Sequence, residues 1–163
     1  MLALDVQNGQ ILWRTRTVPP GYAGGAIWSS TPVVDPVRNS VYFTTGNDYL
    51  LPASVLQCVI DHLDAPQTDP EAPLPAEPED IEACYHTGNH FDSIVAVQPD
   101  TGAVRWSFRG WVYDNFTGAC FVPFLGAFCP NPHGPDYDFG AGANLFHVAG
   151  PGGGRDLLGA GEK

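Results

Sequence analysis

The sequence predicts an all-β chain that is built from short strands and tight turns. Its 163 residues include 19 Gly and 16 Pro, which recur too often for long helices. Short runs of β-branched and aromatic residues, which are typical of strands, lie between these turn formers. A strand–turn–strand unit that ends in tryptophan also occurs twice, as in folds made of radially repeated β-units.

The repeated unit begins at Ala3 and again at Ala96. Each copy has a turn at Asn-Gly or Asp-Thr-Gly, where glycine tolerates a positive φ, and ends four residues later at Trp13 or Trp106. The distance between the copies exceeds one β-propeller blade of about 40–50 residues. Without about 40 residues of intervening insertion it would match one blade, so we expect residues 1–163 to form a partial β-propeller.

The individual strands are expected where short apolar runs are bounded by Gly, Pro, Asn or Asp. We expect three hairpins and one further strand, at 2–6 with 11–16, 27–34 with 40–45, 93–98 with 103–108, and 143–148.

An acidic, proline-rich insertion interrupts this pattern. Residues 61–82 contain eight acids and no Lys or Arg. Such a stretch cannot bury enough apolar surface to offset the entropy cost of ordering it. We therefore expect residues 50–90 to be disordered or loop-like. Solvation alone explains the charge, and binding of cations or a partner is the alternative.

The charge balance and the ends of the chain exclude several classes of protein. A net charge of −11 has the wrong sign to attract nucleic acid or an anionic membrane surface. No apolar run approaches the roughly 20 residues of a membrane span. No signal peptide is visible, and both ends read as the interior of a larger frame, so we expect a fragment.

The four cysteines, Cys58, Cys84, Cys120 and Cys129, form no CxxC or CxxCH motif. This argues against a zinc ribbon, a thioredoxin motif and c-type haem attachment. An even number of cysteines in loop-like surroundings favours disulfides, for which three pairings exist. We favour Cys58–Cys84 and Cys120–Cys129, because each pair brackets one loop, and this implies an oxidising, periplasmic or secreted location. Four reduced thiols in a cytosolic protein are the alternative.

The tryptophan repeat resembles the tryptophan-docking repeat of the quinoprotein alcohol dehydrogenases. Three further segments resemble the same family, at 24–47, 129–140 and 152–163. Ala119-Cys120, Cys129-Pro130 and the Gly-Pro-Asp-Tyr-Asp-Phe-Gly run at 134–140 look closest to its polyvinyl alcohol dehydrogenase branch.

This resemblance implies a fold, cofactors and a reaction. Members of the family are eight-bladed propellers that hold pyrroloquinoline quinone and calcium on the central axis, of which this chain would be about three blades. The implied reaction oxidises an alcohol, such as a polyvinyl alcohol-like polymer, to a carbonyl, with an electron acceptor such as a cytochrome c. The family's calcium-binding glutamate and adjacent cysteine pair are missing here, and Ala26 stands where threonine is common.

The resemblance also assigns site residues. Trp28 would stack under the quinone, and Asn47 would contact the cofactor and bind calcium through its amide oxygen, a hard ligand. Asp138 would be the general base and a second calcium ligand, and Lys163 would donate to the quinone.

Asp136 competes with Asp138 for the role of base, since both would point the same way in an extended segment. The family pattern places an aromatic residue directly before the base, here Tyr137, which favours Asp138.

Two other functions remain open from the sequence. The chain is alternatively a non-catalytic propeller scaffold that binds proteins, or an inactive fragment whose unpaired strand edges would promote aggregation. Convergence of Trp28, Asn47 and Asp138 on one point would favour the enzyme, because a scaffold needs no such site.

Overall fold

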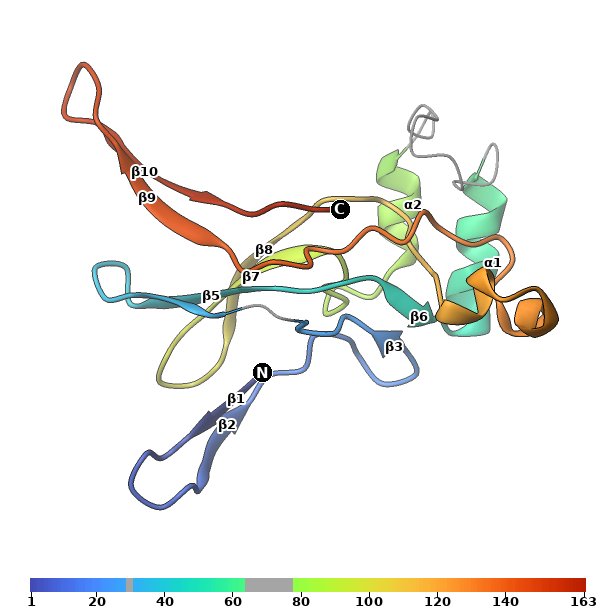
Figure 1. The fold of residues 1–163 in the computed structure, drawn as a ribbon, viewed down its shortest axis with the longest axis horizontal. Helices are drawn as coiled ribbons and strands as arrows, with labels where there is room; N and C mark the ends of the chain where they lie inside the picture. Colours follow the sequence, from blue (N-terminus) through green and yellow to red (C-terminus); the bar gives the residue numbers. More distant parts are fainter. Residues whose placement is uncertain (29–30, 64–77) are drawn as a thin grey trace.

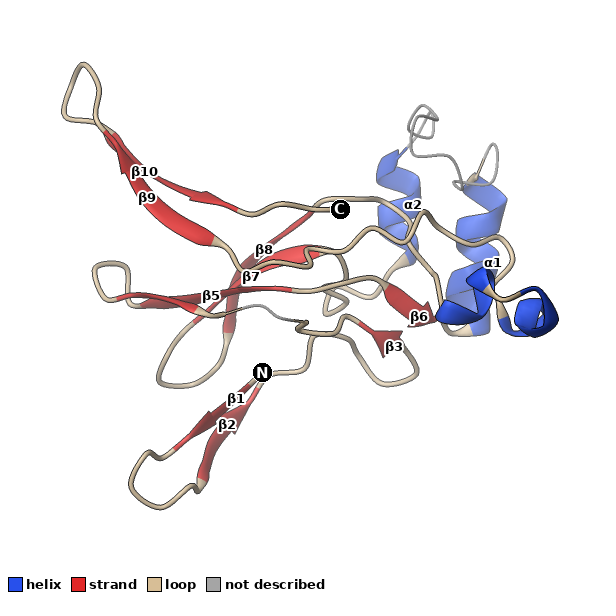
Figure 2. Cartoon of the chain, in the orientation of Figure 1, coloured by secondary structure: helices blue, strands red, loops and turns tan. Residues whose placement is uncertain are grey.

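The computed structural model describes residues 1–28, 31–63 and 78–163. Most regular structure in these ranges is strand, with two α-helices at one end of the molecule (Figure 2). None of the helices in this part of the chain has the length and apolar character needed to span a membrane.

The centre of the fold is a four-stranded antiparallel sheet in the order β4-β5-β7-β8. Its strands are β4 (Val33–Asp35), β5 (Ser40–Thr44), β7 (Ser93–Val97) and β8 (Val104–Arg109).

The expected strands at 40–45, 93–98 and 103–108 are therefore confirmed to within a residue or two at their ends. The expected strand at 27–34 is confirmed only for Val33 and Val34, since residues 27–28 and 31–32 are not in a strand and residues 29–30 lie outside the described part.

Two hairpins flank this sheet on opposite sides in Figure 1. One pairs β1 (Leu2–Leu4) with β2 (Ile11–Arg14), and the other pairs β9 (Asn144–Val148) with β10 (Arg155–Gly159). The hairpin at 2–6 with 11–16 and the strand at 143–148 are thus confirmed.

The side chains of β7 alternate between the two faces of the sheet, as the period of a strand requires. Val95 packs with Phe43 in a cluster that includes Trp13 from the first hairpin. Ile94 packs with Phe139 in a second cluster, which Leu158 of β10 joins. The sheet therefore contributes apolar residues to packing on both of its faces.

Trp13 joins the first repeat to the second. Its indole N–H donates to the Pro99 carbonyl at 2.6 Å, and Thr15 donates to the Gly102 carbonyl at 2.5 Å. Gly102 has a φ of +70°, and a Cβ there would lie 2.4 Å from the Trp13 ring. Glycine is needed both for the turn and for this close approach.

The segment 50–90, which includes the acidic insertion, contains two helices, α1 (Ala53–His62) and α2 (Pro78–Cys84). The expectation of a disordered or loop-like segment over 50–90 is wrong for both helices. Val59 and Ile81 are fully buried in a core with Phe91 and Tyr113, because each helix directs apolar residues to one face. Residues 64–77, which hold much of the acidic run, lie outside the described part.

Both favoured disulfides are present. Cys58–Cys84 joins the two helices, and Cys120–Cys129 closes a short loop. Within that loop lie two 3₁₀ segments, η1 (Gly118–Phe121) and η2 (Pro123–Phe128). Nearby, the short strands β3 (Ala23–Gly24) and β6 (Asp48–Leu50) pair antiparallel.

Candidate functional site

Asp138 lies where segments from four parts of the chain meet. Its Oδ1 accepts hydrogen bonds from the indole N–H of Trp28 and the backbone N–H of Asn47, each at 3.0 Å. Its Oδ2 lies 2.9 Å from Nζ of Lys163. The residue is only 4% exposed. The four residues to which the resemblance assigned roles are therefore in direct contact through one carboxylate.

Gly46 makes this convergence sterically feasible. A Cβ at this position would lie 1.9 Å from Oδ1 of Asp138 and 2.2 Å from Nε1 of Trp28. Any larger residue would separate the indole from the carboxylate. The need for glycine at this position cannot be seen in the neighbouring sequence, because it arises from contacts with the distant residues Trp28 and Asp138.

The backbone around Asp138 is held by a buried carboxylate and by the last residue. Asp114 is 1% exposed and accepts the backbone N–H groups of Asp136, at 3.2 Å, and of Tyr137, at 2.5 Å. The backbone N–H of Lys163 donates to the Asp138 carbonyl at 3.0 Å. Sequence reasoning missed Asp114, although an aspartate among aromatic residues was a signal for a buried acceptor.

Asp136 and Asp138 both contact the same ammonium group. Oδ2 of Asp136 lies 3.2 Å from Nζ of Lys163, although Asp136 has a φ of +64° and the segment is not extended there. The Asp136 side chain is 24% exposed, against 5% for Asp138. Asp138 is the more buried of the two and is the one bonded to Trp28 and Asn47.

Asn47 is 1% exposed, and its side-chain nitrogen is occupied. Nδ2 donates to the backbone carbonyls of Asp48, at 3.1 Å, and of Phe116, at 2.9 Å. These two bonds fix the orientation of the amide group.

A pocket of about 430 Å³ opens beside these residues. Aromatic and polar side chains line it, including Trp28, Tyr49, Phe116, Phe121, Asn47, Thr117, Asp136, Asp138 and Lys163. A neighbouring hollow of about 330 Å³ is lined by Trp28, Asp138, Gly140 and Lys163. Trp28 is 53% exposed, so much of its indole remains available for a planar ligand.

The ammonium of Lys163 is electrostatically stabilised at this site. Its pKa is raised, chiefly by its hydrogen bond to Asp138 and further by Asp136, while partial burial opposes the shift. Lys163 is therefore cationic throughout the physiological pH range.

Several buried acids lie close to Asp138. Asp92 is fully buried, and neither carboxylate oxygen has a hydrogen-bond partner among the described residues. Burial, followed by the neighbouring charges of Asp114 and Glu162, raises the pKa of Asp92 to about 11. Burial also raises the pKa of Asp114 to about 8 and that of Glu162 to about 7. Asp92 is consequently neutral at pH 7, and the charge of this region is lower than its composition implies.

Two curated proteins, both called polyvinyl alcohol dehydrogenase, are similar to the chain. The protein from Sphingopyxis sp. (strain 113P3) is 30% identical over 179 residues, which cover 100% of this chain and 22% of that protein. The protein from a Pseudomonas species is 28% identical over 155 residues, covering 86% of this chain and 18% of that protein. The chain thus spans about a fifth of the length of these relatives. No family model matches it.

Solved structures with a similar fold are quinohemoprotein alcohol dehydrogenases. The Comamonas testosteroni enzyme has a TM-score of 0.53 and 17% identity, over 96% of this chain and 21% of that one. The enzyme ADHIIG from Pseudomonas putida HK5 has a TM-score of 0.54 and 19% identity, over 96% and 20%. At this identity the likeness bears on the fold alone.

Proposed function

We propose that this chain, which is related to the quinoprotein alcohol dehydrogenases, holds the catalytic base and part of the cofactor site of an alcohol-oxidising enzyme. The observation that carries the proposal is the contact of Trp28, Asn47 and Lys163 with the single buried carboxylate of Asp138. A non-catalytic scaffold has no need of such a convergence.

The residues present fit pyrroloquinoline quinone and calcium, which we propose as the cofactors. The half-exposed Trp28 indole offers a flat surface for a ring, and the Lys163 ammonium suits acidic or carbonyl oxygens. The Asn47 amide oxygen and the Asp138 carboxylate are hard oxygen ligands of the kind that calcium prefers. Gly46 keeps the space beside Oδ1 of Asp138 and the Trp28 indole free of side-chain atoms.

When bound, the quinone supplies a two-electron acceptor and calcium supplies a Lewis acid. The protein's part is proton transfer and positioning. Oδ1 of Asp138 is held by Trp28 and Asn47, whereas Oδ2 faces the Lys163 ammonium. We propose that the Asp138 carboxylate takes the proton of the alcohol hydroxyl.

The wider architecture that we propose is about three blades of an eight-bladed propeller. The four-stranded sheet would be one blade, and the hairpins β1–β2 and β9–β10 would belong to its neighbours. The contact of Trp13 with the turn of the second repeat supports this arrangement.

For the substrate we propose an alcohol of the polyvinyl alcohol type, on the basis of the relatives' names. We also propose a periplasmic or secreted location, which the two disulfides support, and an electron acceptor such as a cytochrome c.

The proposal is tested by adding pyrroloquinoline quinone and calcium to the purified protein. Cofactor binding is measured by equilibrium dialysis, and alcohol oxidation by reduction of an artificial dye. In a protein that oxidises alcohol, Asp138→Asn is expected to lower the rate about 10²–10⁴-fold, because the base is lost.

Asp136→Asn is the matched control and is expected to have a much smaller effect, since Asp136 lacks the bonds to Trp28 and Asn47. Equal rates for the wild-type protein and Asp138→Asn would rule out Asp138 as the base.

A further inference from the structure

The loop closed by Cys120–Cys129 exposes three phenylalanine side chains. Phe121 is 70% exposed, Phe124 is 85% exposed and Phe128 is 74% exposed. No residue of η1 or η2, all of which the structure describes, is buried. Three large apolar side chains so exposed within eight residues are unusual on a soluble surface and indicate a binding function.

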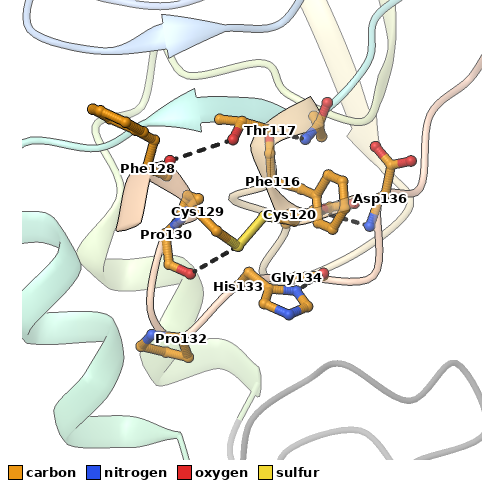
Figure 3. Close-up of a disulfide and its surroundings, with 12 residues drawn as sticks. Phe116, Thr117, Cys120, Phe128, Cys129, Pro130, Pro132, His133, Gly134 and Asp136 are labelled. Atoms are coloured by element: carbon orange, nitrogen blue, oxygen red, sulfur yellow. Dashed lines mark hydrogen bonds between the residues drawn. A yellow bond between two sulfur atoms is a disulfide. The ribbon is translucent and has the colours of Figure 1, made fainter. Parts of the chain in front are cut away.

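The loop is nevertheless held in a defined conformation. The Cys120–Cys129 disulfide joins its ends, and the backbone N–H of Cys129 donates to the Gly126 carbonyl at 3.1 Å. The Thr117 hydroxyl donates to the Phe128 carbonyl at 3.5 Å, and Figure 3 shows the Phe128 ring pointing away from the disulfide. A constrained loop loses less conformational entropy when a ligand binds.

One of the three phenylalanines also belongs to the candidate catalytic pocket. Phe121 lines the pocket that contains Asp138. Its ring packs edge-on against the buried ring of Phe116, with 5.0 Å between centroids. Phe116 in turn accepts the amide N–H of Asn47 at its carbonyl oxygen. Phe121 therefore belongs both to the exposed loop and to the pocket.

The chemistry of this loop favours an uncharged ligand. Residues 117–132 contain no Asp, Glu, Lys or Arg, so nothing in the loop can pair with a phosphate, a carboxylate or an ammonium group. A long-chain polyol has an uncharged carbon backbone whose C–H groups can pack on phenyl rings. Its hydroxyl groups can stay in water or enter the pocket.

We propose that Phe121, Phe124 and Phe128 form a phenylalanine platform that binds the carbon backbone of a polymeric secondary alcohol. The platform would hold one stretch of the chain while a neighbouring hydroxyl reaches Asp138. This inference rests on the proposed function and adds to it the surface that selects polymers over small alcohols. Contacts repeated along one polymer raise its local concentration at the pocket, which a short diol cannot match.

The direct test measures binding without cofactor. Purified protein is titrated by calorimetry with polyvinyl alcohol or with pentane-2,4-diol at equal hydroxyl concentration. We expect at least about tenfold tighter binding of the polymer per hydroxyl. The double variant Phe124→Ser with Phe128→Ser is expected to lose at least about tenfold of that affinity, and it retains Phe121 in the pocket.

The matched control is Phe108→Ser, because Phe108 is 62% exposed on β8 and lies outside the loop. It should bind the polymer as the wild-type protein does. The inference is overturned if the wild-type protein does not prefer the polymer, if the double variant keeps its affinity, or if Phe108→Ser loses as much. A dimer that dissociates in the double variant would identify the platform as a contact between copies and would also overturn it.

Activity separates this inference from the proposed function. If the protein oxidises pentane-2,4-diol and the double variant leaves the KM for the polymer unchanged, the inference fails and the proposed function stands. If polymer binding depends on the platform but no alcohol is oxidised, the inference stands and the proposed function fails.

Discussion

Two segments of this molecule are closed by a disulfide, and they place their apolar side chains in opposite directions. Between Cys58 and Cys84, helices α1 and α2 bury Val59 and Ile81 completely. Between Cys120 and Cys129, no residue of η1 or η2 is buried, and Phe121, Phe124 and Phe128 are mostly exposed.

A disulfide therefore constrains a segment without deciding which way its side chains point. The helices have a periodic apolar face that can form a core, whereas none of the described residues forms a second layer over the shorter loop. The first segment is consequently stabilised by packing as well as by its covalent link.

The largest expected contrast comes from replacing phenylalanine by alanine, once in the core beneath α1 and α2 and once in the shorter loop. Phe91 is fully buried beside Tyr85 and α2, so Phe91→Ala should lower the free energy of unfolding by about 3–5 kcal/mol. Phe124 is 85% exposed, so Phe124→Ala should change it by less than about 0.5 kcal/mol. Urea denaturation measures both values, and similar losses would show that the exposed loop also contributes to a core.

Removing each disulfide should give a smaller contrast. Loop-closure entropy predicts a loss of about 3.5 kcal/mol for Cys58→Ala with Cys84→Ala, whose sequence separation is 26. It predicts about 2.6 kcal/mol for Cys120→Ala with Cys129→Ala, whose separation is 9.

The same denaturation experiment compares the two pairs. The second pair of substitutions should also weaken polymer binding in the folded protein, while the first should not. The reverse order of binding losses would contradict the assignment of the platform to the shorter loop.

A buried carboxyl group gives an effect of another kind, because its size depends on pH. The pKa of the Asp92 carboxyl is raised in the folded state to about 11. Its contribution to stability is therefore complete below the unfolded pKa near 4 and is lost as the pH rises toward 11.

Asp92→Asn removes that dependence. At pH 8 the variant should be more stable than the wild-type protein, because it has no carboxyl group to ionise in the interior, and its stability should fall less between pH 5 and pH 8. Thermal unfolding at a series of pH values measures this, and parallel pH profiles would show that Asp92 does not titrate differently on folding.

Local sequence patterns were sufficient for most of the strands and for the disulfide pairs. Short β-branched runs predicted β5, β7 and β8, and proximity in the sequence predicted both disulfide pairs. The resemblance selected Trp28, Asn47, Asp138 and Lys163, whose contacts the structure then supplied.

Features that depend on contacts between distant segments could not be predicted in this way. Helix α1 contains one acid, Asp61, and its apolar face is buried by Phe91 and Tyr113, which lie much later in the chain. The role of Asp114 requires knowledge of where the backbone of Asp136 and Tyr137 runs.

Gly46 has a consequence for the interpretation of other sequences. Because even a methyl group there would overlap Asp138 and Trp28, an aligned protein can keep both residues and still lose their contact. In a related sequence with alanine at this position, we expect the tryptophan and the aspartate to be present without the hydrogen bond between them. The presence of glycine at position 46 is thus a more stringent criterion for inferring the same site in another sequence than the presence of the tryptophan and the aspartate.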